Sequence, residues 1–181
     1  MKKQLLALSL GFMSIASFAQ KNEIKAAEKA VKKQNFSAAV TAINSAESLI
    51  GNADAKTKAK FYFVKGQAFE GTNDLKSAAK AYNNLLDLEK KTGKKKYTDK
   101  VTPLLGNLIR NVSKKAVGQY NSKDYKGATE SFYLTYALSP KDTSYLFNAA
   151  ISASIAKDFD KALEYYNSLR TIGYTGITKT Y

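Results

Sequence analysis

The chain has 181 residues, of which 44% are hydrophobic and only two are proline; this is the length of one ordinary domain, with a composition that favours helices over strands. It contains no cysteine and no histidine, which excludes disulfides, thiolate nucleophiles, imidazole bases and the usual zinc and haem ligands. The formal net charge of +14 attracts polyanions and acidic surfaces in a salt-dependent way.

Residues 1–19 have the features of a secretory signal peptide. Two lysines precede an apolar run that ends at Phe18, and the small residues Ser17 and Ala19 stand where a signal peptidase requires them. The apolar run is shorter than the ~20 residues that span a bilayer, so we expect a cleaved leader rather than an uncleaved anchor. The leader resembles those of Bacteroidetes-type Gram-negative bacteria. We therefore predict an exported, periplasmic or outer-envelope protein that begins at Gln20 with a net charge of +12, because the leader removes two lysines from the +14.

A repeated spacing organises the rest of the chain. Four pairs of small residues lie twelve positions apart: Ala27 and Ala39, Gly66 and Ala78, Ala116 and Ala128, and Ala150 and Ala162. A large apolar residue stands three positions before each second member: Phe36, Leu75, Tyr125 and Phe159. Another stands four positions after it: Ile43, Tyr82, Phe132 and Tyr166. This pattern predicts four helical hairpins, in which small residues lie where two helices cross closely and large residues fill the groove between them.

The predicted turn inside each hairpin ends on a residue that can cap the second helix. These residues are Asn35, Asp74, Asp124 and Asp158, each directly before a large apolar residue. Asparagine and aspartate side chains accept hydrogen bonds from the free amides of a helix N-terminus. We therefore expect the second helix of each hairpin to begin just after them.

The spacing resembles the tetratricopeptide repeat (TPR), whose pattern has a small residue in the first helix, an alanine early in the second, an aromatic residue four positions later and a proline near the end. Residues 109–142 match best, through Ala116, Ala128, Phe132 and Pro140. The last two units are 34 residues apart, which is the period of the family. The resemblance implies an all-α solenoid of antiparallel helix pairs. The units would cover about residues 20–51, 53–91, 102–140 and 142–170. An unrelated all-helical bundle is the alternative.

Several local signals predict helix ends within this array. Gly51 is expected to end the first unit in a left-handed conformation. Thr102 and Pro103 are expected to form the N-cap and first position of the helix that opens the third unit, and Asp142 is expected to cap the fourth. The tail, residues 171–181, contains no polar capping helix. The last unit could stay partly open, the tail could fold over it, or the chain could continue past Tyr181; we expect the last of these.

No arrangement of residues in the sequence favours catalysis. The carboxylates are spread over different predicted helices, and neither a glycine-rich phosphate loop nor a metal-ligand spacing occurs. We therefore predict a non-catalytic protein without metal or cofactor. The TPR resemblance implies a concave groove, lined by the first helices, that binds a partner peptide or protein and serves as a scaffold in the cell envelope. The groove candidates are Lys60, Phe63, Gln67, Val117, Tyr120, Phe147, Asn148 and Ile151. Phe63 could instead pack against the first predicted repeat, residues 20–51.

A basic stretch between the second and third predicted units offers a second function. Its lysines are Lys90, Lys91, Lys94, Lys95, Lys96 and Lys100, against two acids. It could form a loop that binds an acidic polymer, an envelope glycan or a membrane surface. We favour a solvated, partly mobile linker, since a run of charge without a stacking or amide-rich frame has no specific site. Nucleic acid is not expected as a partner of an exported protein.

Overall fold

The computed structural model describes residues 19–176, and this part of the chain is helical with no strand. The predicted all-α class is confirmed. The predicted signal peptide, apart from Ala19, and the end of the tail, residues 177–181, lie outside the described residues. The chain divides into two compact units between Thr102 and Pro103, which is where the third repeat was predicted to start. Each unit is described by itself.

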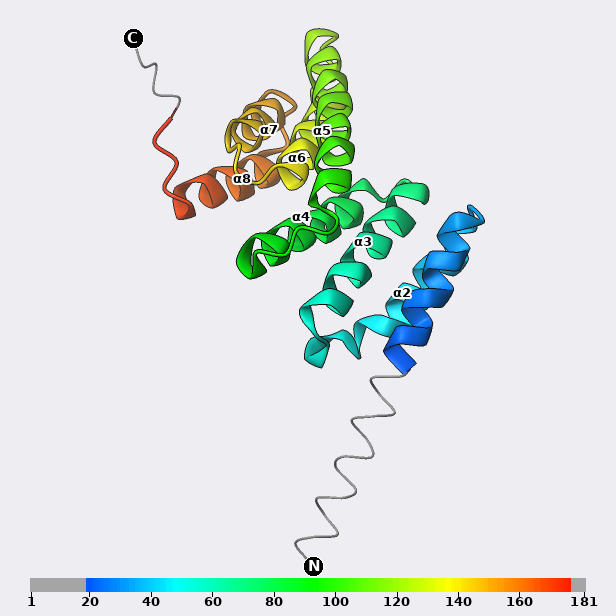
Figure 1. The fold of residues 1–181 in the computed structure, drawn as a ribbon. Coiled ribbons are helices and arrows are strands. Elements are labelled where there is room, and N and C mark those ends of the chain that lie inside the picture. The colour runs from blue at the N-terminus through cyan, green and yellow to red at the C-terminus, as the bar shows by residue number, and fades with distance from the viewer. Residues whose placement is uncertain (1–18, 177–181) are drawn as a thin grey trace, which may run out of the picture. The chain divides into compact units, whose positions relative to one another are not determined.

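The first unit contains four helices and one short turn. A helix over residues 19–32 is followed by α2 (Phe36–Glu47), the 3-10 turn η1 (Ile50–Asn52), α3 (Ala55–Gly71) and α4 (Leu75–Thr92) (Figure 1). The pattern of apolar residues puts one face of the helix over residues 19–32, of α2 and of α3 into a shared core. That core consists of Ile24, Ala27, Ile43, Ala46, Ile50, Phe61 and Val64.

The α3–α4 crossing shows why the repeat needs a small residue. Gly66 lies so close to the ring of Tyr82 that a Cβ atom at position 66 would overlap it. Tyr82 is fully buried, and its hydroxyl donates a hydrogen bond of 2.6 Å to Glu70 Oε2. Burial, together with the hydrogen bond to Glu70 and its negative charge, raises the pKa of Tyr82, so the phenol stays a donor at physiological pH.

The second unit contains most of α5 (Thr98–Asn121), together with α6 (Tyr125–Leu138), α7 (Ser144–Ile155) and α8 (Phe159–Thr171). Its core consists of Ala116, Ala128, Phe132, Leu146, Ala149, Ala150, Tyr165 and Leu169. Tyr165 also stacks on Tyr133, with ring centroids 4.8 Å apart. Three of the predicted small residues, Ala116, Ala128 and Ala150, are thus at the centre of this core, as the spacing predicted.

The turns inside the four hairpins share one backbone geometry. The residue before each cap has a positive φ: Gln34 at 57°, Asn73 at 61°, Lys123 at 67° and Lys157 at 60°. The side chains of the four predicted capping residues accept hydrogen bonds from Ala38 N, Ser77 N, Gly127 N and Lys161 N. In addition, the amide of each cap donates to the carbonyl five residues earlier, at 2.9 Å. The capping prediction is confirmed in all four turns.

The positive φ at Lys157 leads to a prediction about stability. A residue with a Cβ pays about 1–2 kcal/mol in this conformation, whereas glycine adopts it freely but loses more chain entropy on folding. We expect Lys157→Gly to raise the free energy of unfolding by about 0.5 kcal/mol, and Lys157→Ala to give no gain. Urea unfolding of the two variants tests this. Equal stability of the glycine and alanine variants would show that the backbone at position 157 is not strained.

Three predicted helix ends are corrected. The helix α2 ends at Glu47, and Gly51 lies in η1 without a positive φ, because the 3-10 turn carries Ile50 into the core. The helix α5 begins at Thr98 rather than at Pro103, so Pro103 lies inside it. The third correction is smaller: α7 begins at Ser144 with Thr143 at the N-cap position, although the Asp142 carboxylate does accept the Ser144 amide.

Candidate functional site

The groove candidates of the first unit lie on α3 and already have neighbours within the unit. Lys60 Nζ lies 2.6 Å from Glu28 Oε2. Phe63 is partly buried, packs against the first-unit core and stacks on Tyr97 with ring centroids 4.6 Å apart. Gln67 is partly buried as well. Phe63 thus packs within this unit beside Tyr97, and its contact with a partner stays a prediction.

The groove candidates of the second unit lie on α5 and α7, and they differ in accessibility. Val117 is 49% exposed. Tyr120 is partly buried, in edge contact with the rings of Tyr125 and Phe132. Phe147 contacts Tyr174 of the tail, with centroids 5.4 Å apart. Asn148 and Ile151 are partly buried. Each unit thus holds its own set of candidates, and a groove shared by both sets stays a prediction.

The loop between α4 and α5 is shorter than the predicted basic stretch, because the two helices include both ends of that stretch. Lys90 and Lys91 lie in the last turn of α4, where positive charge is favoured by the helix dipole. Gly93 then ends α4 in the left-handed conformation with φ 71°. Lys100 lies in the first turn of α5. Only residues 93–97 connect the two helices, so Lys94, Lys95 and Lys96 are the lysines on the loop itself.

Glu89 fixes this loop, and its carboxylate is almost fully buried, with 1% of the residue exposed. It accepts hydrogen bonds from Tyr97 N at 2.9 Å, from Thr98 N at 2.9 Å and from Thr98 Oγ1 at 2.7 Å. These are free donors at the start of α5, so Glu89 caps that helix from a distance in sequence. Burial by itself raises the pKa of this carboxyl, but the hydrogen bonds from Thr98 and Tyr97 outweigh burial and lower it. The linker prediction assumed that the charged stretch has no amide-rich frame, and the hydrogen bonds to Glu89 supply one. The sequence gives no sign of this frame, because nothing in it shows that Glu89 is buried.

The face of α8 carries a stripe of large apolar side chains that the sequence reasoning did not identify. Phe159 is 68% exposed, Leu163 63% and Tyr166 40%; we call these three residues the α8 stripe. Their spacing of four and three positions places them on one side of the helix. Stripes of this kind mark interaction sites more often than isolated exposed apolar residues do.

The residues that correspond to Tyr166 and Leu163 are buried on α4 and α6, whereas those that correspond to Phe159 are half-buried. The counterparts of Tyr166 are Ile43, Tyr82 and Phe132, and all three are buried. The counterparts of Leu163 on α4 and α6, Ala79 and Thr129, are also buried. The helix α3 packs against α2, and α7 packs against α6, whereas no described helix follows α8. Within the second unit, no described helix packs on the side of α8 that carries the stripe.

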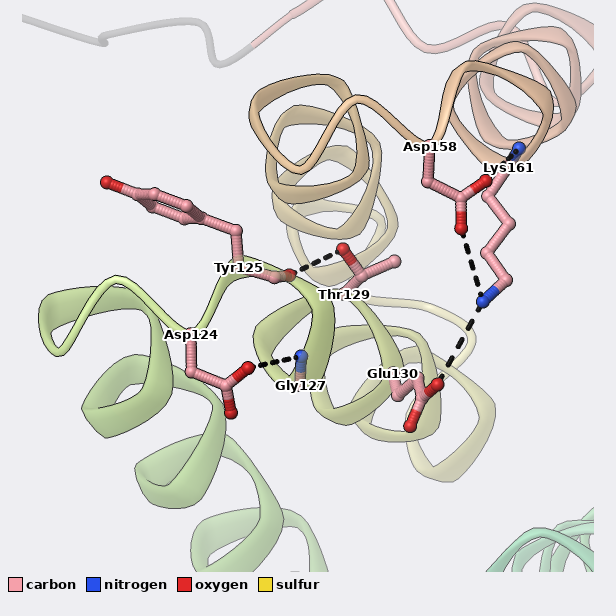
Figure 2. A network of polar contacts seen from close by, with 7 residues as sticks. All are labelled: Asp124, Tyr125, Gly127, Thr129, Glu130, Asp158 and Lys161. Carbon is pink, nitrogen blue, oxygen red and sulfur yellow. Dashed lines mark hydrogen bonds and ion pairs between the residues drawn. The ribbon is translucent and has the colours of Figure 1, made fainter.

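A network of polar contacts ties the start of α8 to α6 (Figure 2). Lys161 Nζ lies 3.4 Å from Asp158 Oδ2 and 3.9 Å from Glu130 Oε1. On α6, Asp124 accepts the Gly127 amide at 3.0 Å. The N-terminus of the helix that carries the α8 stripe is therefore capped by Asp158, and its Lys161 forms an exposed ion pair with α6.

The described tail covers one side of α7 and leaves the α8 stripe open. Tyr174 packs against the second-unit core and against Phe147. Its amide donates to the carbonyl of Leu169 after the left-handed residue Gly173. The tail thus folds back on the last hairpin in part. A continuation of the chain past Tyr181 stays a prediction.

The described residues show neither a group of three histidine, cysteine, aspartate or glutamate side chains that could hold a metal ion, nor, between residues 19 and 176, a helix with the length and apolarity to cross a membrane. No protein-family model matches the chain, and no curated protein matches its sequence significantly.

Proposed function

We propose that this protein is a non-catalytic protein-interaction module of the cell envelope, built as a TPR-like solenoid of helical hairpins, and that the α8 stripe binds a helix of a partner protein. The observation that carries the proposal is the exposure of Leu163 and Tyr166 at positions that α4 and α6 bury. An apolar face that repeats the pattern of covered faces fits the first helix of another hairpin. The repeat spacing and the four equivalent turns support the solenoid.

The α8 stripe can be altered without harming the fold. Leu163→Asp places a charge on a side chain that is 63% exposed, so we expect the free energy of unfolding to change by less than about 0.5 kcal/mol. The same substitution removes apolar area from a partner contact and adds a charge to it. Urea unfolding checks the first expectation. A loss of several kcal/mol would mean that Leu163 is covered within the chain itself.

Photo-cross-linking in the organism that makes the protein tests the proposal. A photoreactive side chain in place of Leu163 is expected to form one discrete protein adduct. The matched control carries the same group in place of Asp87, an exposed residue of α4, and is expected to form none. Adding Phe159→Ser and Tyr166→Ser should abolish the adduct. An adduct of the chain with itself would identify a second copy as the partner. No adduct at position 163, or equal adducts at both positions, would contradict the proposal.

The groove candidates remain a second way for the same module to bind protein. Val117 is the most accessible of them, and Val117→Asp tests it with little risk to the fold. Phe63→Ala would be a poor test, because it removes the stack on Tyr97 and so mixes stability with binding.

A further inference from the structure

A basic hollow in the first unit involves no residue of the α8 stripe and, of the groove candidates, only Lys60. It encloses about 370 Å³ between the helix over residues 19–32, the start of α3 and the loop before α5. Five lysines line it: Lys21, Lys25, Lys56, Lys60 and Lys96. Ile24 and Thr57 also line it. Its volume lies in the range of pockets that hold small organic ligands.

The positive charge of the hollow is only partly balanced. Asp54 is the one acid among its lining residues, and its carboxylate is engaged by Thr57 N at 2.8 Å and Thr57 Oγ1 at 3.0 Å. Glu28 pairs with Lys60. Five lysines against these two acids leave a surplus of three positive charges. The hydrogen bonds of Thr57 lower the pKa of Asp54, and the charge of Lys21 lowers it further. An anion in the hollow would relieve the repulsion between the lysines.

A second hollow of about 200 Å³ adjoins the first. Lys56 and Lys96 line both hollows, and Lys94, Thr92 and Glu89 line the second one but not the first. The Glu89 carboxylate is occupied by its hydrogen bonds from Tyr97 and Thr98. Ala55, Ala59 and Leu88 give the second hollow apolar walls. Lys56 and Lys96 thus lie between the two hollows. The first hollow has more lysines, and the second has more apolar side chains in its walls.

The loop that carries Lys96 is held in place before any ligand binds. The Glu89 carboxylate accepts hydrogen bonds from the amides of Tyr97 and Thr98. Phe63 stacks on the Tyr97 ring, and Lys96 Nζ lies 5.2 Å from the centroid of the same ring. A fixed backbone lowers the entropy that binding costs. Charge on a fixed frame makes a site, whereas the same charge on a mobile linker gives only diffuse attraction.

We propose that the paired hollows bind a phosphorylated organic molecule, with its phosphate between Lys56 and Lys96 and its less polar part in the neighbouring space. Lysine ammonium groups bind phosphate as strong point charges. The required chemistry is a phosphate monoester on a small organic group, whether as a free sugar phosphate or as the headgroup of a phosphatidic acid.

Binding measurements with two probes test this proposal. Glucose 1-phosphate is titrated by calorimetry, with glucose as the neutral control, and phosphatidylcholine vesicles with and without phosphatidic acid are tested by co-sedimentation. We expect at least one phosphate probe to bind. The double variant Lys56→Gln and Lys96→Gln should weaken that binding at least about tenfold, since two charged contacts are lost. Binding of glucose 1-phosphate would assign the site to free phosphates, and binding of the phosphatidic acid vesicles alone would assign it to lipid.

A matched double variant separates a site from general attraction. Lys95 and Lys100 belong to the same basic stretch and are exposed, but they line neither hollow. Lys95→Gln with Lys100→Gln therefore removes the same charge and should leave the affinity within about twofold, because only long-range attraction changes. Equal weakening in the two double variants would overturn the proposal, as would the failure of both phosphate probes to bind the unaltered protein. Thermal unfolding of all variants checks that they are folded.

Discussion

Tyr82→Ala is expected to lower the free energy of unfolding of the first unit by about 3–5 kcal/mol, the range observed for large aromatic side chains truncated in a core. Tyr82 is fully buried against Gly66. Because Gly66 has no side chain, position 66 cannot fill the cavity that the missing ring leaves. The substitution also removes the hydrogen bond to Glu70.

The repeat supplies a matched control for this prediction. Tyr166 occupies the corresponding position on α8 but is 40% exposed. Tyr166→Ala should therefore cost about 1 kcal/mol or less, in line with its smaller loss of buried area. Urea unfolding followed by circular dichroism measures both values. If the two substitutions cost the same, the α8 stripe is covered in the free protein and the difference between the hairpins is not real.

Glu89→Ala is expected to cost about 2–4 kcal/mol, because it leaves the amides of Tyr97 and Thr98 and the Thr98 hydroxyl without their acceptor. The loss should be local at first, with fraying at the start of α5. Hydrogen exchange of the Tyr97 and Thr98 amides measures this fraying directly. Unchanged protection of these two amides would contradict the role of Glu89 as a cap.

The same residue makes stability depend on pH. Its pKa is lowered in the folded state, so Glu89 contributes stability that is fully present above its unfolded pKa of about 4.3 and is lost as the pH falls through its folded pKa. Glu89→Gln keeps the shape of the side chain but cannot ionise. Urea unfolding from neutral pH to about pH 3 should therefore show a shallower loss of stability in this variant. Parallel curves for the variant and the unaltered protein would exclude the contribution.

The local features of the hairpins could be predicted from the sequence because each depends on a few neighbouring residues. The spacing of small and large residues predicted where helices cross, as the Gly66–Tyr82 contact shows. Asp74, Asp124 and Asp158 could be recognised as caps because aspartate before a large apolar residue is a local signal. Two of the left-handed residues before them, Lys123 and Lys157, are lysines, and lysine gives no signal for this conformation.

The start of α5 and the frame of the basic loop could not be predicted. Glu89 reaches amides eight and nine positions along the chain, and the turn that brings them together depends on Gly93 and on the stack of Phe63 against Tyr97. In the sequence, Glu89 is one acid beside many lysines and looks solvated. The hollow around Lys56 and Lys96 was missed for the same reason, since its lysines come from three separate segments.

The α8 stripe was foreseen only in outline. The sequence predicted a last hairpin without a polar capping helix, but Phe159 and Tyr166 fit the repeat pattern of buried residues, and Leu163 gave no separate signal. Exposure depends on which elements pack against a helix, and the sequence of α8 itself does not determine that. This is why the structure was needed to show which side of the hairpin is open.

Cysteine accessibility in intact cells tests the central claim, that the α8 stripe is covered by a partner. Because the chain contains no cysteine, the substitutions Leu163→Cys and Asp87→Cys each introduce a single thiol. In the purified protein, both thiols should react with an alkylating reagent at similar rates. In cells, the account predicts that the thiol at position 163 reacts at least about tenfold more slowly than the thiol at position 87, as burial in a stable interface requires. Equal rates at both positions in cells would contradict it.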